Sequence, residues 1–360
     1  MERFACSTMI VSGEGALQAL SEGAGGRLAV VTEDFLERSG LVRNLLNRVK
    51  CEKTLIIKDV HPEPTIRQAV EGAETLRRFQ PDGVVALGGG NVMDCAKAMR
   101  CFAKWDCVLT VVPTTIGSGA EASGDVTLTH DGRRHTLRDD AMRPDRVILE
   151  TVMLDQTSRV ELGEGGFSLL ASGLESYAGK RTGILADIHA REAFAVAWAA
   201  LPAALSGSTA ARRRVQTASV MAAMARDQSG SGLCSALCGS LGTVFHLSQG
   251  KLAGIVLPAV VGWNAHGVPQ RYAELARAAG LGGSSAAAGA GNLKTGLLRL
   301  RRELGLPGTL AQAGIDPRSV WNQAKRIVQL TLEDRAWANN PVTVDDFVVR
   351  RILEEITGRL

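Results

Sequence analysis

Short apolar runs alternate with amphipathic stretches in the first half of the chain. Runs of apolar residues bounded by turn signals predict buried strands at 27–31, 54–57, 83–87 and 108–112. Helical spacing of the apolar residues between these runs predicts helices over 33–49, 65–79 (with Thr65 as a cap) and 91–102. This strand–helix alternation indicates a parallel sheet with helices on both faces.

The second half has little strand signal and is rich in Ala, Leu and Arg at helical spacing. Helices are expected over 184–205, 210–226, 293–304 and 342–360. The stretch AAGLGGSSAAAGAG (278–291) has low complexity and is expected to form a loop. The pattern therefore predicts an α/β domain with a parallel sheet over residues 1–160 and an all-α domain over 161–360.

Composition narrows the class of protein. The chain has 360 residues, of which 45% are hydrophobic and 22% charged, as in soluble globular proteins. A net charge of +4 without a dense basic run argues against nucleic acid as a partner. The longest apolar stretch, 193–205, is too short for a bilayer and contains Pro202, so no membrane partner is expected. Seven cysteines without a C-x-x-C and no signal-peptide pattern favour free thiols in the cytoplasm.

Six histidines are spread along the chain, and no two lie within four residues of each other. A helical pair of histidines that grips a metal, as in H-E-x-x-H hydrolases, is therefore excluded.

The stretch VVALGGGNVMDCAKAM (84–99) carries the clearest chemical signal. A buried strand runs into Gly88, Gly89 and Gly90, and a helix opens at Asn91. Glycines permit a positive φ and leave no Cβ in the way of a diphosphate. The first turn of a helix adds unpaired N–H groups and the positive end of its dipole. A tight strand–helix turn without a ligand is the alternative interpretation.

A second loop, VVPTTIGSGAEAS (111–123), follows the next predicted strand. Thr114, Thr115 and Ser118 can donate hydrogen bonds to a ribose or a phosphate, although a surface loop rich in Ser, Thr and Gly is the alternative. Because parallel strands end at the same sheet edge, the two loops are expected to lie together where open α/β sheets bind ligands. Together they favour nucleotide binding.

These motifs resemble those of the iron-containing (group III) alcohol dehydrogenase superfamily, with its dehydroquinate synthase-like fold. GGGNVMDCAKAM is similar to the family's GGGSxxDxAK, and PTTIGSGAE to its PTTxGTGSE. Similar segments follow in the family's order, namely VSGEGAL, PDRVILE, GLESYAG and GKLAGIVLPAVVGWN. The resemblance implies a Rossmann-like N-terminal domain, a helical C-terminal domain and an active-site cleft between them. It also implies a homodimer or larger oligomer that acts on a small alcohol or carbonyl compound.

The resemblance further implies which residues bind the dinucleotide. They are Gly88, Gly89, Gly90, Asn91, Asp94 and Lys97, flanked by Thr114, Thr115 and Ser118. Glu33 stands where the family often has an Asp for the adenosine ribose, and an acid there would repel a 2′-phosphate. NAD is therefore expected rather than NADP, although a solvated acid at a helix start is the alternative for Glu33. Arg134 stands where many members have a Lys.

The family holds a divalent metal, usually iron or zinc, with one Asp and three His. At the corresponding positions this chain has Ser168, Ser172, Ser235 and Gln249. Hydroxyls and amides are poor ligands for these metals, so no catalytic metal is expected. Hydrogen-bond donors would have to replace the Lewis acid, and the candidates are Ser172, Ser235, Gln249 and His246. A soft site formed by Cys234, Cys238 and His246 is an alternative, but core cysteines are favoured.

Two functions remain open on this basis. The first is a metal-free, NAD-dependent carbonyl reductase or alcohol dehydrogenase, for which the metal-free maleylacetate reductases are a precedent in the superfamily. The second is a non-catalytic homologue that keeps the dinucleotide loops for stability, sensing or assembly. Non-redox chemistry in the same cleft is a third possibility. Fold resemblance alone does not choose among them.

Overall fold

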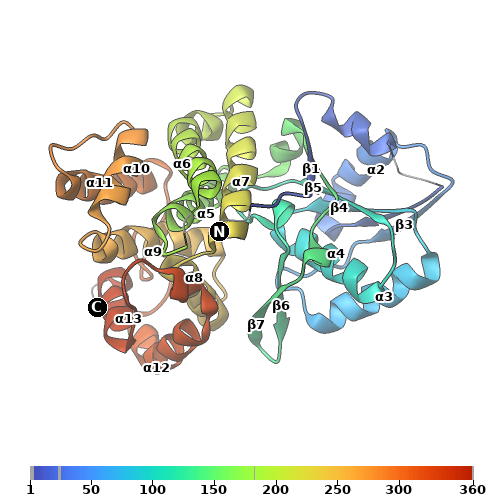
Figure 1. Cartoon of the computed structure of the whole chain (residues 1–360). Helices are drawn as coiled ribbons and strands as arrows, with labels where there is room; N and C mark the ends of the chain where they lie inside the picture. Colours follow the sequence, from blue (N-terminus) through green and yellow to red (C-terminus); the bar gives the residue numbers. More distant parts are fainter. Residues whose placement is uncertain (1–3, 23–25, 182, 359–360) are drawn as a thin grey trace. The chain divides into compact units, whose positions relative to one another are not determined.

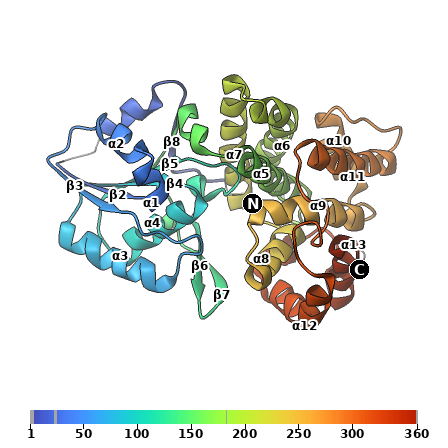
Figure 2. The same cartoon turned by 180° about the vertical axis from the view of Figure 1, so that it is seen from behind.

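The computed structural model describes residues 4–22, 26–181 and 183–358 (Figures 1 and 2). The described chain divides into two compact units, 5–157 and 158–358, and Phe4 is grouped with the second. This division falls close to residue 160, where the change in sequence pattern leads us to expect a boundary.

A six-stranded parallel sheet organises the first unit. Its strands, in spatial order, are β1 (Met9–Ser12), β8 (Arg146–Leu149), β5 (Val108–Pro113), β4 (Gly83–Gly88), β2 (Arg27–Val31) and β3 (Lys53–Ile57). The four strands predicted from apolar runs are confirmed to within one residue at each end. β1 and β8 are not among the predicted strands, because each has only three consecutive apolar residues.

Helices cover both faces of this sheet, as the alternation predicts (Figure 1). On one face, a core that includes Leu17, Leu45 and Val85 lies between the strands and three short helices. These are η1 (Ala16–Ser21), α1 (Asp34–Arg38) and α2 (Leu41–Leu46), and the other face carries α3 (Ile66–Phe79) and α4 (Gly90–Ala103). Thr65 caps α3 by accepting a hydrogen bond from the Gln68 amide at 3.1 Å.

The prediction of a single helix over 33–49 is wrong, because the structure has two short helices there. The chain turns between α1 and α2 at Gly40, whose φ of +83° lies in the left-handed region that favours glycine. Apolar spacing alone does not reveal this break, because both short helices place their apolar residues on the same core.

An antiparallel hairpin, β6 (Asp125–His130) and β7 (Arg133–Arg138), follows the second loop. Its turn is Asp131–Gly132, with φ values of +48° and +68°. An Asp-Gly pair between two alternating stretches is a known hairpin signal that could have indicated these strands. The remaining short helices of this unit are η2 (Ala120–Ala122), η3 (Asp140–Met142) and η4 (Thr151–Gln156).

The second unit is helical. Its elements are α5 (Arg159–Ala178), α6 (Ile184–Leu205), α7 (Thr209–Ser229), α8 (Leu233–Phe245), α9 (Gln249–Asn264), α10 (Pro269–Ala278), α11 (Ala286–Glu303), α12 (Pro317–Glu333), η5 (Arg335–Asn339) and α13 (Asp346–Thr357). The centre is α5, which contacts α6, α7 and α9 and is buried around most of its circumference. Small and apolar residues on all sides are typical of such a buried helix.

The four helices predicted in this half are present: α6 has the predicted bounds, and the other three have shifted ends. Residues 359–360 of the helix predicted over 342–360 lie outside the described residues. The loop expected over 278–291 is wrong in its second part, because α11 already begins at Ala286. Ser285 caps it by accepting a hydrogen bond from the Ala288 amide at 3.2 Å. Among the described helices of the chain, none is long and apolar enough to cross a membrane.

Candidate functional site

The carboxyl ends of β2 and β4 form the first part of the candidate site. From β2 the chain passes to β3 at one edge of the sheet, whereas from β4 it passes to β5 in the opposite direction. Adjacent strands whose connections diverge in this way mark a switch point, where open α/β sheets bind their ligands. The two strands are joined near this end by a hydrogen bond from Thr32 Oγ1 to the Leu87 carbonyl at 2.8 Å.

The glycine loop after β4 packs directly against the second loop. A Cβ on Gly89 would lie 3.2 Å from Thr115 Oγ1, and a Cβ on Gly90 would lie 2.7 Å from the Cβ of Ser118. A Cβ on Gly88 would approach Val92 to 2.6 Å. The expectation that these glycines supply a positive φ is wrong, because none of the three has one. They are required for close packing of the two loops at the start of α4.

The second loop is organised by its own hydrogen bonds. The Thr114 amide donates to the Gly88 carbonyl at 3.0 Å, which ties the two loops together. Ser118 Oγ donates to Glu121 Oε2 at 3.1 Å and accepts from the Ala120 amide at 3.2 Å. Gly117 has a φ of +85°, which lies in the left-handed region of backbone conformation that favours glycine. As expected, the two loops lie together.

Asp94 and Lys97 of α4 hold the hairpin and the second loop in place. The Lys97 side chain has no exposed surface, and its Nζ donates to the Asp125 carbonyl at 2.5 Å and the Ala120 carbonyl at 3.1 Å. Asp94 Oδ2 accepts from the Thr127 amide at 3.0 Å, and Oδ1 lies 3.5 Å from Lys97 Nζ. Lys97 therefore fixes the backbone around the loops from within, and its expected contact with the dinucleotide stays a prediction.

Two further residues were expected to contact the dinucleotide. Glu33 lies just beyond the end of β2, separated from it by Thr32, and precedes the first residue of α1, so it lies at the switch point. It is half-buried, and its backbone forms a bridge with Asp59. Arg134 lies on β7, opposite Thr129, and is also half-buried.

In the helical unit, one face of α5 carries two carboxylates and two hydroxyls. Glu164, Ser168, Ser172 and Glu175 are spaced at four, four and three residues, which places them on one stripe of the helix. Their exposed fractions are only 9%, 6%, 6% and 5%. Three helical turns therefore separate the two acids, and the two serines lie between them.

Glu175 meets the first turn of α8. Its Oε1 accepts from the Cys234 amide at 2.6 Å, and its Oε2 accepts from Ser235 Oγ at 2.5 Å. A Cβ on Gly232 would lie 2.7 Å from the same carboxylate, so the glycine makes room for it. Burial raises the pKa of Glu175 above its usual range, although the hydrogen bonds from Ser235 and the backbone oppose the rise.

Glu164 meets the first turn of α9 in the same manner. Ser248 Oγ donates to Glu164 Oε2 at 2.5 Å, and Lys251 Nζ lies 3.6 Å from Oε1. A Cβ on Gly250 would lie 2.4 Å from the Glu164 carbonyl oxygen, which shows how closely the two helices approach. Gln249, between these contacts, is exposed.

The soft-metal alternative has no support. Cys234 and Cys238 are buried with their sulfurs 4.0 Å apart, and the pKa of Cys234 is raised well above its usual range by its contact with Cys238 and by burial. His246 ends α8 with a left-handed φ of +55° and is exposed. Across residues 4–22, 26–181 and 183–358, no three His, Cys, Asp or Glu side chains gather as a metal-binding group.

Comparison with known proteins assigns the chain to a family. The profile described as "Iron-containing alcohol dehydrogenase" matches residues 7–151, and "Fe-containing alcohol dehydrogenase family, C-terminal" matches residues 164–357. The chain belongs to the iron-containing alcohol dehydrogenase family.

Several members of this family are similar over their whole length. The chain is 29% identical to the 1-propanol dehydrogenase PduQ of Citrobacter freundii, covering 99% of this chain and 100% of that protein. It is 25% identical to the NADPH-dependent butanol dehydrogenase of Clostridium saccharobutylicum, covering 98% and 97%. The solved iron-containing alcohol dehydrogenase of Thermococcus thioreducens has a TM-score of 0.90 at 25% identity, covering 98% and 99%.

The side chains of this family member do not suit the family's metal. At the four positions where the resemblance predicts the family's ligands, the donors are three hydroxyls and one amide, none of which is a ligand of choice for iron or zinc. Ser235 already uses its proton in the hydrogen bond to Glu175. The dinucleotide loops, in contrast, suit a nucleotide: two loops meet at a switch point, and the first turn of a 14-residue helix opens there.

Proposed function

We propose that this protein interconverts a small alcohol and its carbonyl compound by NAD-dependent hydride transfer without a divalent metal. The observation that carries the proposal is the hydrogen bond between Ser235 and the buried Glu175, because it supplies a proton-transfer pair where relatives have a metal ligand. The names of the relatives, a 1-propanol dehydrogenase and a butanol dehydrogenase, support a short primary alcohol as the substrate class.

Bound NAD would supply the hydride acceptor for alcohol oxidation, and NADH the hydride donor for the reverse reaction. In the proposal, the loops that contain Gly89, Gly90, Thr115 and Ser118 hold the diphosphate at the start of α4. Glu33 binds the adenosine ribose and disfavours a 2′-phosphate, which makes NAD the preferred cofactor. Lys97 and Asp94 keep these loops in register through the backbone contacts described above.

Ser235 and Glu175 form the proton path in this proposal. During oxidation the alcohol O–H bond breaks and its proton passes to Ser235 Oγ, while the proton of Ser235 moves to Glu175 Oε2. The hydrogen on the carbon that bears the alcohol oxygen leaves as hydride with both electrons of the C–H bond, and the C=O bond forms. In reduction each proton moves in the opposite direction, and Ser235 protonates the oxygen that has gained negative charge.

Two features favour this pair over the other candidate donors. Gln249 and His246 are exposed, and an exposed donor is a weaker electrostatic partner than one in a dry environment. Ser172 is buried one turn before Glu175 on the same stripe and can orient the substrate oxygen. Among the described residues, however, its hydroxyl has no hydrogen bond to a carboxylate that could accept its proton. The raised pKa of Glu175 brings its proton affinity closer to that needed near neutral pH.

Purified protein tests the proposal directly. We expect turnover of NADH with propanal and of NAD with 1-propanol, unchanged by a chelator, and metal analysis should find far less than one iron or zinc per chain. One metal per chain, with activity lost on chelation and restored by the ion, would overturn the metal-free mechanism. Tight NADH binding without turnover of either substrate would instead identify a non-catalytic homologue.

A further inference from the structure

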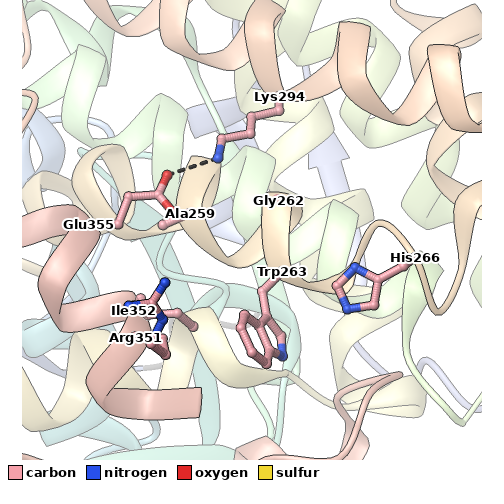
Figure 3. Close-up of a pocket in the computed structure, with 8 residues that line it drawn as sticks. All are labelled: Ala259, Gly262, Trp263, His266, Lys294, Arg351, Ile352 and Glu355. Atoms are coloured by element: carbon pink, nitrogen blue, oxygen red, sulfur yellow. Dashed lines mark hydrogen bonds and ion pairs between the residues drawn. The ribbon is translucent and has the colours of Figure 1, made fainter. Parts of the chain in front are cut away.

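A pocket of about 190 Å³ lies in the helical unit, formed by residues that none of the proposed chemistry uses. Three helices build it, and its lining residues are Ala259, Gly262 and Trp263 of α9, His266 just beyond α9, Lys294 of α11, and Arg351, Ile352 and Glu355 of α13. Figure 3 shows the α13 side chains on one side of the pocket and Trp263 and His266 on the other.

Lys294 is held in a defined position at this pocket. Its Nζ forms an ion pair with Glu355 Oε1 at 2.8 Å, which links α11 to α13 (Figure 3). A Cβ on Gly262 would lie only 2.6 Å from Nζ and 3.0 Å from Cδ, so the Lys294 chain lies across α9 where that helix has no side chain. The amine is therefore fixed by packing as well as by charge.

Trp263 provides an aromatic wall. Its ring makes edge contacts with His266 and Phe347, at centroid distances of 6.0 and 6.2 Å. Phe347 is 62% exposed, although aromatic residues are only 4% of the chain. Phe347 lies outside the lining and packs against Trp263, whose ring is the aromatic surface that the pocket offers to a ligand.

The polar groups of the lining are mostly donors. Lys294 and Arg351 together carry about eight N–H donors. Glu355 forms an ion pair with Lys294. Glu354, which does not line the pocket, forms an ion pair with a guanidinium nitrogen of Arg351. A ligand that supplies acceptors would complete this set.

We propose that this pocket binds a small planar carboxylate. Its ring would stack on or against Trp263, and its carboxylate would accept hydrogen bonds from Lys294 and Arg351. Guanidinium and ammonium groups are the usual partners of carboxylates, and a charge-assisted pair is about twice as strong as a neutral one. The pocket is smaller than a drug-sized site of roughly 300 Å³ or more, so a single-ring acid suits it.

Benzoate is the probe, titrated calorimetrically into the whole protein. We expect one saturable site per chain, with affinity reduced about tenfold in Lys294→Met and in Arg351→Gln, because each removes one charge-assisted bond. Benzamide, which has the same shape without the charge, should bind more weakly than benzoate. Trp263→Leu should weaken both compounds, since it removes the aromatic wall.

Arg350→Gln is the matched control. It removes the same charge from the neighbouring position of α13, where Arg350 pairs with Asp346 rather than lining the pocket. Affinity should stay unchanged in this variant and in Ser235→Ala, which separates the pocket from the proposed catalytic pair. No saturation up to about 10 mM benzoate, or equal affinity in the wild type, Lys294→Met and Arg351→Gln, would overturn the proposal. Circular dichroism of each variant identifies any that fails to fold.

Discussion

The hydroxyl of Ser235 donates to the carboxylate of Glu175 at 2.5 Å, across the junction of α8 and α5. The resemblance predicts that position 235 corresponds to a metal-ligating histidine of the family. Glu175 also accepts a hydrogen bond from the Cys234 amide. The positive end of the α8 helix dipole therefore stabilises the negative charge of this carboxylate. A serine here is therefore joined to a buried acid that can take up or release its proton.

Ser235→Ala removes the first group of this path. We expect kcat to fall about 100-fold, because a positioned acid or base contributes about that much. The KM for NADH should change little, since the dinucleotide loops lie on other elements. Steady-state kinetics with propanal measures both. Ser231→Ala is the control, because it removes a hydroxyl just before α8 and outside the pair, and a loss of kcat as large as in Ser235→Ala would contradict the assignment.

The pH dependence of the two directions should have opposite signs. Alcohol oxidation requires Glu175 as the carboxylate, so kcat should rise as pH rises through its elevated pKa. Carbonyl reduction requires the protonated acid, and its kcat should fall over the same range. In Glu175→Gln the titration of this residue should disappear from both profiles. Profiles in that variant with the wild-type inflection would assign the titrating group elsewhere.

Gly90→Ala tests the packing of the two loops. The new Cβ would lie 2.7 Å from the Cβ of Ser118, so the loops must separate, at a cost of about 1–3 kcal/mol in the free energy of unfolding. NADH affinity should fall with it. The double variant Gly90→Ala, Ser118→Gly removes the opposing side chain and should recover most of the stability in urea unfolding. Equal stability of wild type and Gly90→Ala would show that the loops are not in close contact.

The sequence predicts the central strands β2, β4 and β5 well because they are buried and locally apolar. β2 and β4 have continuous apolar runs, and their glycine and hydroxyl loops identify the sheet edge that binds ligands. Sequence reasoning fails where contacts between residues far apart in the chain determine which residue a position requires. The missing Cβ of Gly90 serves a contact with Ser118, 28 positions later, which no local pattern shows.

The helical unit shows the same limit more sharply. The resemblance identifies Ser168, Ser172, Ser235 and Gln249 as replaced ligands, but it does not reveal what their neighbours do instead. Glu164 contacts Ser248 at the start of α9, and Glu175 contacts Ser235 in the first turn of α8. Each contacted serine lies more than 50 residues later in the chain than its acid. One signal was present: both acids lie on the same helical stripe as the two serines, and buried carboxylates on one stripe require partners.

Lys97→Met should destabilise the first unit strongly. The lysine is fully buried, and its loss would remove a hydrogen-bond donor from the carbonyls of Ala120 and Asp125 and the cation that pairs with the carboxylate of Asp94. Breaking a buried ion pair in this way costs about 3–5 kcal/mol. Lys104→Met, an exposed lysine at the other end of α4, is the matched control and should change the free energy of unfolding by less than about 0.5 kcal/mol. Because Lys97 holds the loops through the backbone of Ala120 and Asp125, added NADH should stabilise both variants to the extent that their loops remain folded. A Lys97→Met protein that unfolds like the wild type yet loses all NADH affinity would instead show that this amine binds the cofactor directly.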